Sequence, residues 1–117
     1  MAKAVAACQQ PEGYWTRSLL DPEHAPGPET SGTAFFTYGL LWGMNNGFLD
    51  KATYQPVVEK AWKYLTTVAL QPDGRVGYVQ PIGEKAIPGQ VVDANSTANF
   101  GVGAFLLAAC EMVRFLN

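Results

Sequence analysis

A four-residue turn motif, Gln-Pro-acid-Gly, occurs twice in this sequence, and aromatic residues follow each copy. The first copy spans 10–13 within QQPEGYWT, and the second spans 71–74 within LQPDGRVGYV. Proline followed by an acidic residue and glycine is ordinary turn chemistry, so the turn by itself does not establish a duplication. A duplicated structural unit requires that the flanking segments correspond as well.

The segments that follow the two turns do correspond. Each turn leads into a short extended stretch, then a loop, then an apolar helix that begins with ETSGTAFF at 29–36 or DANSTANF at 93–100. We therefore predict an internal repeat over about 1–50 and 51–117. Chance similarity between two helical hairpins is the alternative. The matched pairs are Glu29 with Asp93, Thr33 with Thr97, Ala34 with Ala98 and Phe36 with Phe100.

Hydrophobic periodicity predicts about four helices. The helix at 53–70 carries one apolar stripe, as an outer helix does, whereas the helices at 31–46 and 96–116 are apolar almost all round. Paired outer and inner helices of this kind are the units of an (α/α) toroid. The expected fold is therefore all-α, a partial (α/α) toroid of helical hairpins. The remaining expected elements are a helix at about 2–10 and short extended segments at 14–20 and 76–80.

Charged residues make up only 15% of the chain and hydrophobic residues 48%, whereas about 25% charged residues is usual in globular domains. Two units with four helices cannot close a ring, so they leave an apolar flank open. We expect one partial domain over 1–117, with this flank covered by a missing N-terminal part or by self-association. The Ala-rich start of the sequence reads as the tail of a helix, which favours the C-terminal part of a larger toroid.

Several functional classes find no support in the sequence. The net charge of −2, without a basic run, gives no electrostatic footprint for nucleic acid or for an anionic membrane. No apolar stretch approaches the ~20 residues of a membrane span. His24 stands alone in a proline-rich loop, and Cys8 and Cys110 lie in apolar helical contexts typical of buried thiols, so we expect neither a metal nor a cofactor.

Five segments carry a resemblance to a known family. They are GYWTRSLLDPE, PETSGTAFFTYGLLWGMNNGFLD, YQPVVEKAWKYL, PDGRVGYVQPIG and FGVGAFLLAACEM. Together they resemble the closing third of glycoside hydrolase families 88 and 105, the unsaturated glucuronyl and unsaturated rhamnogalacturonyl hydrolases. The resemblance covers nearly the whole chain and implies a six-hairpin (α/α) barrel, as well as residence in the bacterial cytoplasm or periplasm.

The resemblance also implies a substrate and a mechanism. These families remove a 4,5-unsaturated uronic acid from the non-reducing end of oligosaccharides left by polysaccharide lyases. A carboxylic acid protonates the enol-ether double bond, water adds to the neighbouring carbon, and the resulting hemiketal collapses. The family's catalytic aspartate, and the arginine and tryptophan that hold the sugar, lie upstream of the segment seen here. We therefore expect no catalytic residue in this chain and no activity from the chain alone.

Four residues are candidates for substrate binding. Glu29 and Asp93 each precede a predicted inner helix, where a carboxylate either lines the cleft or caps the helix N-terminus. Trp15 and Arg17 share one face of an extended segment. Tryptophan can stack on a sugar ring and arginine can bind a uronate bidentately, but a tryptophan packed under a loop is the competing interpretation.

Two other functions stay open at this point. The first is a non-catalytic α/α module that assembles with itself or with another chain through the apolar flank. The second is another (α/α) toroid enzyme acting on a different polysaccharide or on a terpenoid.

Overall fold

Helices account for all the regular structure in the computed structural model, which describes residues 1–117. The extended stretches predicted at 14–20 and 76–80 form only isolated bridges, Trp15 with Glu29 and Leu70 with Val76. The predicted all-α class is therefore confirmed. The elements are α1 (Ala2–Ala7), the 3-10 turn η1 (Pro22–His24), α2 (Thr30–Asn45), α3 (Lys51–Tyr64), the π-helical segment η2 (Leu65–Ala69) and α4 (Asn99–Leu116).

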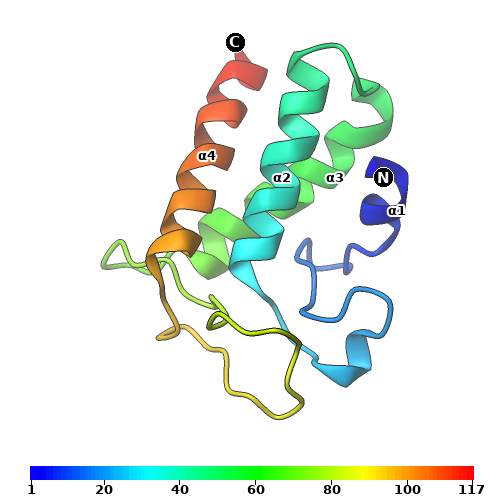
Figure 1. Cartoon of the computed structure of the whole chain (residues 1–117). Helices are drawn as coiled ribbons and strands as arrows, with labels where there is room; N and C mark the ends of the chain where they lie inside the picture. The colour runs from blue at the N-terminus through cyan, green and yellow to red at the C-terminus, as the bar shows by residue number, and fades with distance from the viewer.

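The helices α2 and α4 run parallel and side by side, whereas α3 runs antiparallel to them in a second layer (Figure 1). This is the arrangement of inner and outer helices in one sector of an (α/α) toroid. The N-termini of α2 and α4 point to the same end of the molecule. The two long connections, 8–29 and 70–98, gather at that end.

Helix α2 stays buried although it carries several hydroxyl side chains. Thr33 donates its hydroxyl to the Glu29 carbonyl, and Thr37 donates to the Thr33 carbonyl, each at 2.7 Å. Because these bonds run within the helix, the hydroxyls need no water and both threonines are fully buried. The helix can therefore pack on several sides, as its apolar sequence predicted.

The core consists of two clusters of buried apolar side chains. The cluster beside the long loops joins Leu65 and Ala69 of η2 to Val76, Val79 and Ala104. The second cluster lies between α2, α3 and α4 and contains the fully buried side chains of Trp15, Leu41 and Val58, among others.

Two helices begin at residues other than those predicted, because individual hydrogen bonds decide where each helix starts. Helix α3 begins at Lys51, since Asp50 rather than Thr53 is the N-cap and accepts from the Thr53 N–H at 2.9 Å. Pro56 therefore lies inside the helix and not in its first turn. Helix α4 begins at Asn99 instead of 96, because the carbonyl of Ser96 accepts from the Val79 N–H at 2.9 Å and is held outside the helix.

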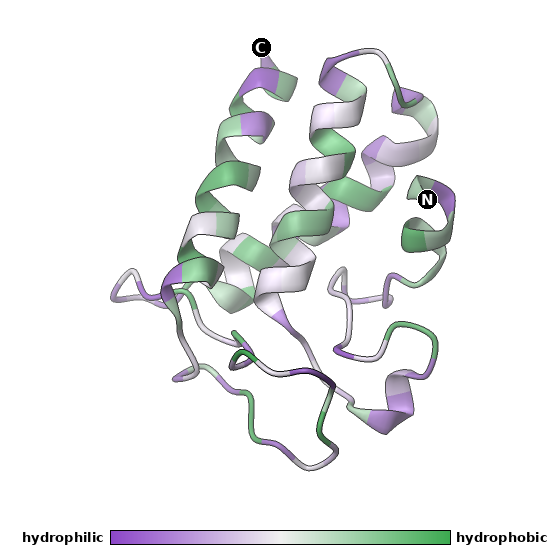
Figure 2. Cartoon of the chain, viewed as in Figure 1, coloured by the Kyte–Doolittle hydropathy of each residue, from purple (hydrophilic) through white to green (hydrophobic).

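One flank of the α2–α4 pair exposes apolar side chains, and Figure 2 shows the hydrophobic colouring along α4. Phe35 of α2 is 48% exposed and Leu106 of α4 is 57% exposed. Cys110 is exposed too, although the sequence predicted a buried thiol, and Trp42 of α2 is 43% exposed. By length and composition α4 could cross a membrane, contrary to the sequence-based expectation, but core helices of soluble proteins share this property.

Candidate functional site

The candidate site lies at the end of the molecule where α2 and α4 begin. Most polar side chains with long-range partners lie there, on or next to the two long loops, whereas the opposite end holds the short connection 46–50 and the contact between Asn45 and Glu111. Loops placed on a rigid helical scaffold are the usual location of binding residues. The groups at this end are a capping carboxylate, a strained tyrosine and an arginine-lined pocket.

The carboxylate of Glu29 caps α2 and ties it to the second loop. Glu29 is 2% exposed. Its two oxygens accept from the Ser31 N–H at 3.1 Å, the Ser31 hydroxyl at 2.7 Å, the Gly32 N–H at 2.7 Å and the Gln80 N–H at 2.9 Å. With four donors, this carboxylate is occupied entirely as a hydrogen-bond acceptor, so its place is that of a helix cap.

Tyr78 lies between the starts of the two inner helices in a strained backbone conformation. Its φ of 61° makes it the one non-glycine residue with positive φ. Its N–H donates to the Asp93 carbonyl at 2.8 Å, and its carbonyl accepts from the Thr30 N–H at 2.7 Å. Because left-handed conformations are costly for a side-chain-bearing residue, these bonds hold the segment in a fixed shape.

A buried hydroxyl pair lies directly beneath this segment. The hydroxyls of Tyr64 and Thr30 are 2.8 Å apart, and the Tyr64 ring packs against Tyr14 with centroids 5.6 Å apart. Burial raises the pKa of Tyr64 well above its ordinary value, and the nearby Glu29 carboxylate raises it further. Tyr64 therefore stays a neutral hydroxyl at physiological pH. Its side chain belongs to the core, with only 2% of its surface exposed.

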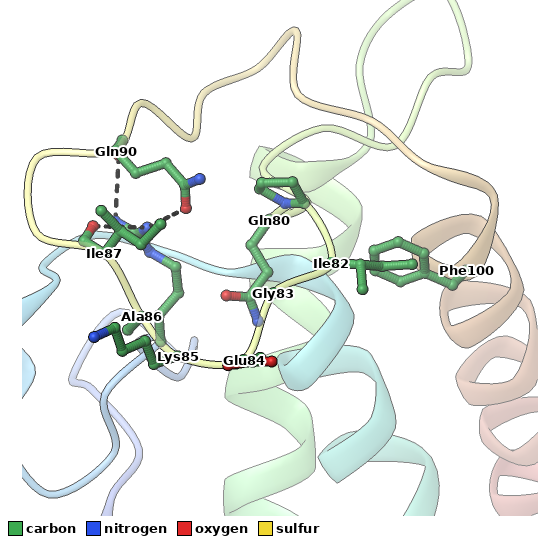
Figure 3. Close-up of a pocket in the computed structure, with 11 residues that line it drawn as sticks. Gln80, Ile82, Gly83, Glu84, Lys85, Ala86, Ile87, Gln90 and Phe100 are labelled. Atoms are coloured by element: carbon green, nitrogen blue, oxygen red, sulfur yellow. Dashed lines mark hydrogen bonds between the residues drawn. The ribbon is translucent and has the colours of Figure 1, made fainter.

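A pocket of about 340 Å³ opens beside Arg17 under the loop at 80–90 (Figure 3). Figure 3 shows the Ile82 side chain beside the Phe100 ring, and the Gln80 side chain directed into the loop. Amide, aromatic and charged groups in one concave site are typical of a small-molecule pocket. The lining residues are Arg17, Gln80, Pro81, Ile82, Gly83, Glu84, Lys85, Ala86, Ile87, Gln90 and Phe100.

Arg17 joins the two long loops across the pocket. Its Nη1 donates to Gln90 Oε1 at 3.0 Å and to the Ile87 carbonyl at 3.4 Å, and its Nη2 donates to the Gln90 carbonyl at 3.3 Å. All three acceptors are neutral. Arg17 is thus the one sequence-predicted residue that lines the pocket.

The other three predicted residues occupy different places. Trp15 is 1% exposed, with its indole N–H donating to the Val5 carbonyl at 2.8 Å, so its ring packs in the core and offers no face to a ligand. Glu29 is the helix cap described above. Asp93 is exposed, and its Oδ1 accepts from the Asn95 N–H at 2.9 Å and the Ser96 hydroxyl at 3.4 Å. The structure brings Arg17 together with none of these three.

Sequence reasoning missed most of the pocket. Gln80, Gln90 and Phe100 approach Arg17 from positions more than 60 residues away along the chain, and no local pattern signals such pairing. The glycine-rich and proline-rich loop at 81–90 was the available hint. The structure contains no cluster of three or more histidine, cysteine, aspartate or glutamate side chains that could hold a metal ion.

Comparison with known proteins agrees with this architecture. The family model described as Glycosyl Hydrolase Family 88 matches residues 1–116. A solved family 88 glycosyl hydrolase from Bacteroides vulgatus is 77% identical, superposes with a TM-score of 0.93, and is covered over 33% of its length by 98% of this chain. A second solved protein, described as a polysaccharide lyase, is 88% identical with a TM-score of 0.92, and 98% of this chain covers 32% of it.

Two further relatives extend the comparison. An unsaturated 3S-rhamnoglycuronyl hydrolase from Formosa agariphila is 46% identical over 97% of this chain, which spans 29% of that protein. A possible family 105 member from Salmonella enterica serovar Paratyphi A is 24% identical with a TM-score of 0.84, over 99% of this chain and 30% of that chain. This likeness shows the shared fold. The chain spans about a third or less of these proteins, so it forms one sector of a larger (α/α) toroid.

The family model matches residues 1–116, and the helical arrangement agrees with it: this chain belongs to glycoside hydrolase family 88.

Proposed function

We propose that this chain is one sector of a hydrolase that removes 4,5-unsaturated uronic acid from the non-reducing end of oligosaccharides produced by polysaccharide lyases. The sector forms a wall of the substrate cleft. The observation that carries this proposal is the gathering of both long loops, with the Arg17 pocket, at the N-terminal end of the parallel α2–α4 pair. The Formosa agariphila relative, named as an unsaturated rhamnoglycuronyl hydrolase, supports the substrate class.

The catalytic acid comes from the rest of the toroid. An acid that protonates an enol ether must carry a proton and then give it up. Glu29, the one buried carboxylate at this end of the chain, accepts four hydrogen bonds and has no free oxygen directed at a substrate. The carboxylates of Asp93 and Glu84 are exposed on loops, without the burial that tunes an acid for catalysis.

In this proposal Glu29 and Asp93 shape the cleft indirectly. Glu29 fixes the 78–80 segment through the Gln80 N–H, and the Asp93 carbonyl holds Tyr78 from the other side. Tyr78, half-buried and strained, is then the aromatic side chain best placed to face the cleft. Trp15 supports Glu29 from within the core, because its carbonyl accepts from the Glu29 N–H at 3.2 Å.

The apolar flank meets the remaining hairpins of the toroid. Its residues have the helical spacing of an inner-helix interface, and the matched relatives are three times the length of this chain or more. Self-association of the isolated chain through Phe35 and Leu106 is the alternative. It predicts dimers or larger species when the chain is purified alone.

A polysaccharide lyase is a second candidate function, because the solved protein that is 88% identical carries that description. The two activities change the C4–C5 double bond of the uronic acid in opposite ways. A lyase creates the conjugated double bond of an unsaturated uronic acid, whereas the proposed hydrolase consumes it. The ultraviolet absorbance of that double bond therefore rises with a lyase and falls with the hydrolase.

The test uses a hybrid protein, in which this chain replaces the matching 114-residue segment of the Formosa agariphila hydrolase. The hybrid supplies the missing sectors and covers the apolar flank. We expect it to consume the unsaturated oligosaccharide that its parent hydrolyses, with falling absorbance. Rising absorbance on an intact uronate polysaccharide would favour the lyase. A folded hybrid that changes neither substrate would count against both.

A further inference from the structure

Arg17 has no acidic partner in this chain. Of the three arginines, Arg75 pairs with Asp73 at 2.8 Å and Arg114 pairs with Glu111 at 2.9 Å. Arg17 instead contacts two carbonyls and one amide oxygen, although it is half-buried at the edge of a pocket. A half-buried guanidinium without a counter-charge is favourably placed to receive an anion.

The hydrogen bonds of Arg17 leave part of its donor set free. A guanidinium has five N–H groups. Two from Nη1 and one from Nη2 are used on Gln90 and Ile87, so the Nε–H and the second Nη2 N–H have no acceptor in the chain. These neighbouring donors can bind two oxygens of one carboxylate or sulfate group.

The loop contacts hold Arg17 ready for such a ligand. Gln90 lies 73 residues from Arg17 along the chain and fixes the guanidinium from both its side-chain and backbone oxygens. A side chain that is already ordered loses less conformational entropy when a ligand binds. The pocket also carries Lys85 at its rim, turned away from Gln80 in Figure 3, against a single carboxylate, that of Glu84.

We infer that Arg17 binds the anionic group, a carboxylate or a sulfate ester, of a substrate saccharide. Gln80 and Gln90 supply amide contacts to neighbouring hydroxyls, and Phe100 supplies an apolar surface for the ring. The saccharide class rests on the proposed function, whereas the anion preference rests on the geometry of Arg17 alone.

The test measures binding to the hybrid protein labelled with 15N-arginine. The probes are methyl glucuronide with methyl glucoside, and rhamnose 3-sulfate with rhamnose. The Arg17 Nε–H signal, identified by its loss in Arg17→Gln, should shift saturably with an anionic probe and little with its neutral counterpart. The more effective of the two anionic probes shows whether the ligand is a carboxylate or a sulfate.

Three variants separate anion binding from loop positioning. Arg17→Gln should weaken the anionic probe about tenfold, the loss of one charge-assisted interaction, and should leave the neutral probe nearly unchanged. Gln90→Ala frees the loop but keeps the charge, so it should preserve the preference for the anionic probe. Arg75→Gln, the same change outside the pocket, should leave the affinity for both the anionic and the neutral probe unchanged.

Equal shifts with charged and neutral probes, or equal losses in Arg17→Gln and Gln90→Ala, would overturn the inference and leave Arg17 as a loop clamp. This failure is distinct from failure of the proposed function. A hybrid that consumes the unsaturated substrate but shows no anion preference keeps the function and rejects the inference. A hybrid that prefers the anionic probes but does not consume the unsaturated substrate keeps the inference and rejects the proposed function.

Discussion

The Glu29 carboxylate accepts a 2.9 Å hydrogen bond from the backbone N–H of Gln80, which lies 51 residues further along the chain. The same carboxylate caps α2 through Ser31 and Gly32. One side chain therefore starts an inner helix and fixes the loop that forms the pocket. Removing this carboxylate should therefore destabilise both the start of α2 and the loop at Gln80.

Replacing Glu29 with alanine should destabilise the chain by about 2–4 kcal/mol, since it removes a helix cap and leaves buried N–H groups without an acceptor. Urea unfolding followed by circular dichroism measures the change. The control is Glu59→Ala on the exposed face of α3, where the carboxylate accepts only from Gln55. A change below about 0.5 kcal/mol is expected there. Similar losses in both variants would contradict the role assigned to Glu29.

The two Gln-Pro-acid-Gly turns each end in a glycine, and these two glycines form a matched pair for mutation. Gly13 and Gly74 have φ of 99° and 88°, so alanine is strained at both positions. A Cβ at Gly13 would also overlap the Lys60 carbonyl, whereas nothing lies within 4 Å of one at Gly74. Gly74→Ala should cost about 1–2 kcal/mol from strain alone, and Gly13→Ala should cost clearly more. Equal unfolding free energies would show that the first turn does not pack on α3 as described.

The Tyr64 hydroxyl makes the chain sensitive to alkaline pH. Its folded pKa is raised above the ordinary value of 10.0 by burial, so the folded state disfavours the phenolate that the unfolded state forms freely. The stabilisation is fully present below about pH 10 and is lost as pH rises above it. Tyr64→Phe should therefore lose less stability between pH 9 and 11 than the parent chain, on the order of 1 kcal/mol less. Parallel pH curves for the two proteins would refute this assignment.

A polar latch joins α2 and α4 at the end opposite the pocket. Asn45 Nδ2 donates to Glu111 Oε2 at 2.8 Å and to its carbonyl at 3.0 Å, and Glu111 is 7% exposed. Asn45→Ala should cost about 1–3 kcal/mol, because it strips hydrogen bonds from a buried carboxylate. Arg114→Ala removes a largely exposed partner of the same carboxylate and should cost less than about 1 kcal/mol. If thermal unfolding showed a larger loss of stability for Arg114→Ala than for Asn45→Ala, the ion pair and not the amide would be the main partner of Glu111.

The apolar flank should make the isolated chain associate. Phe35 and Leu106 expose apolar surface that the rest of a toroid would cover. Sedimentation velocity should show dimers or larger species for the isolated chain. Leu106→Glu should shift the population toward monomer, whereas Leu116→Glu, at the exposed last residue of α4, should not. A well-behaved monomer with little binding of hydrophobic dyes would contradict an open flank.

The sequence predicted the helices better than their ends. Apolar periodicity is a property of many residues, so α2 and α4 appeared near their true ranges. Helix ends depend on single contacts: the Asp50 carboxylate accepts from the Thr53 N–H, and the Val79 N–H donates to the Ser96 carbonyl. The second of these pairs is distant in sequence and leaves no local signal.

The pocket could be predicted only in part, because most of its contacts also join residues that are distant in sequence. Arg17 was a candidate because of its residue type and its neighbours, and it does line the pocket. Its partners Ile87 and Gln90 come from a loop about 70 residues away, and only the packing of α2 against α4 brings that loop near. Trp15 was predicted on the same face as Arg17. In the structure its indole N–H donates to the Val5 carbonyl, and its ring lies in the core.

The most direct test of the account compares the ultraviolet absorbance of an unsaturated oligosaccharide during incubation with the hybrid protein and with the isolated chain. We predict that the hybrid consumes the conjugated double bond at a rate within about tenfold of its parent, a loss of roughly 1.4 kcal/mol or less in transition-state stabilisation. The isolated chain should leave the absorbance band unchanged. Rapid loss of the band with the isolated chain would place the catalytic acid within these 117 residues and contradict the account.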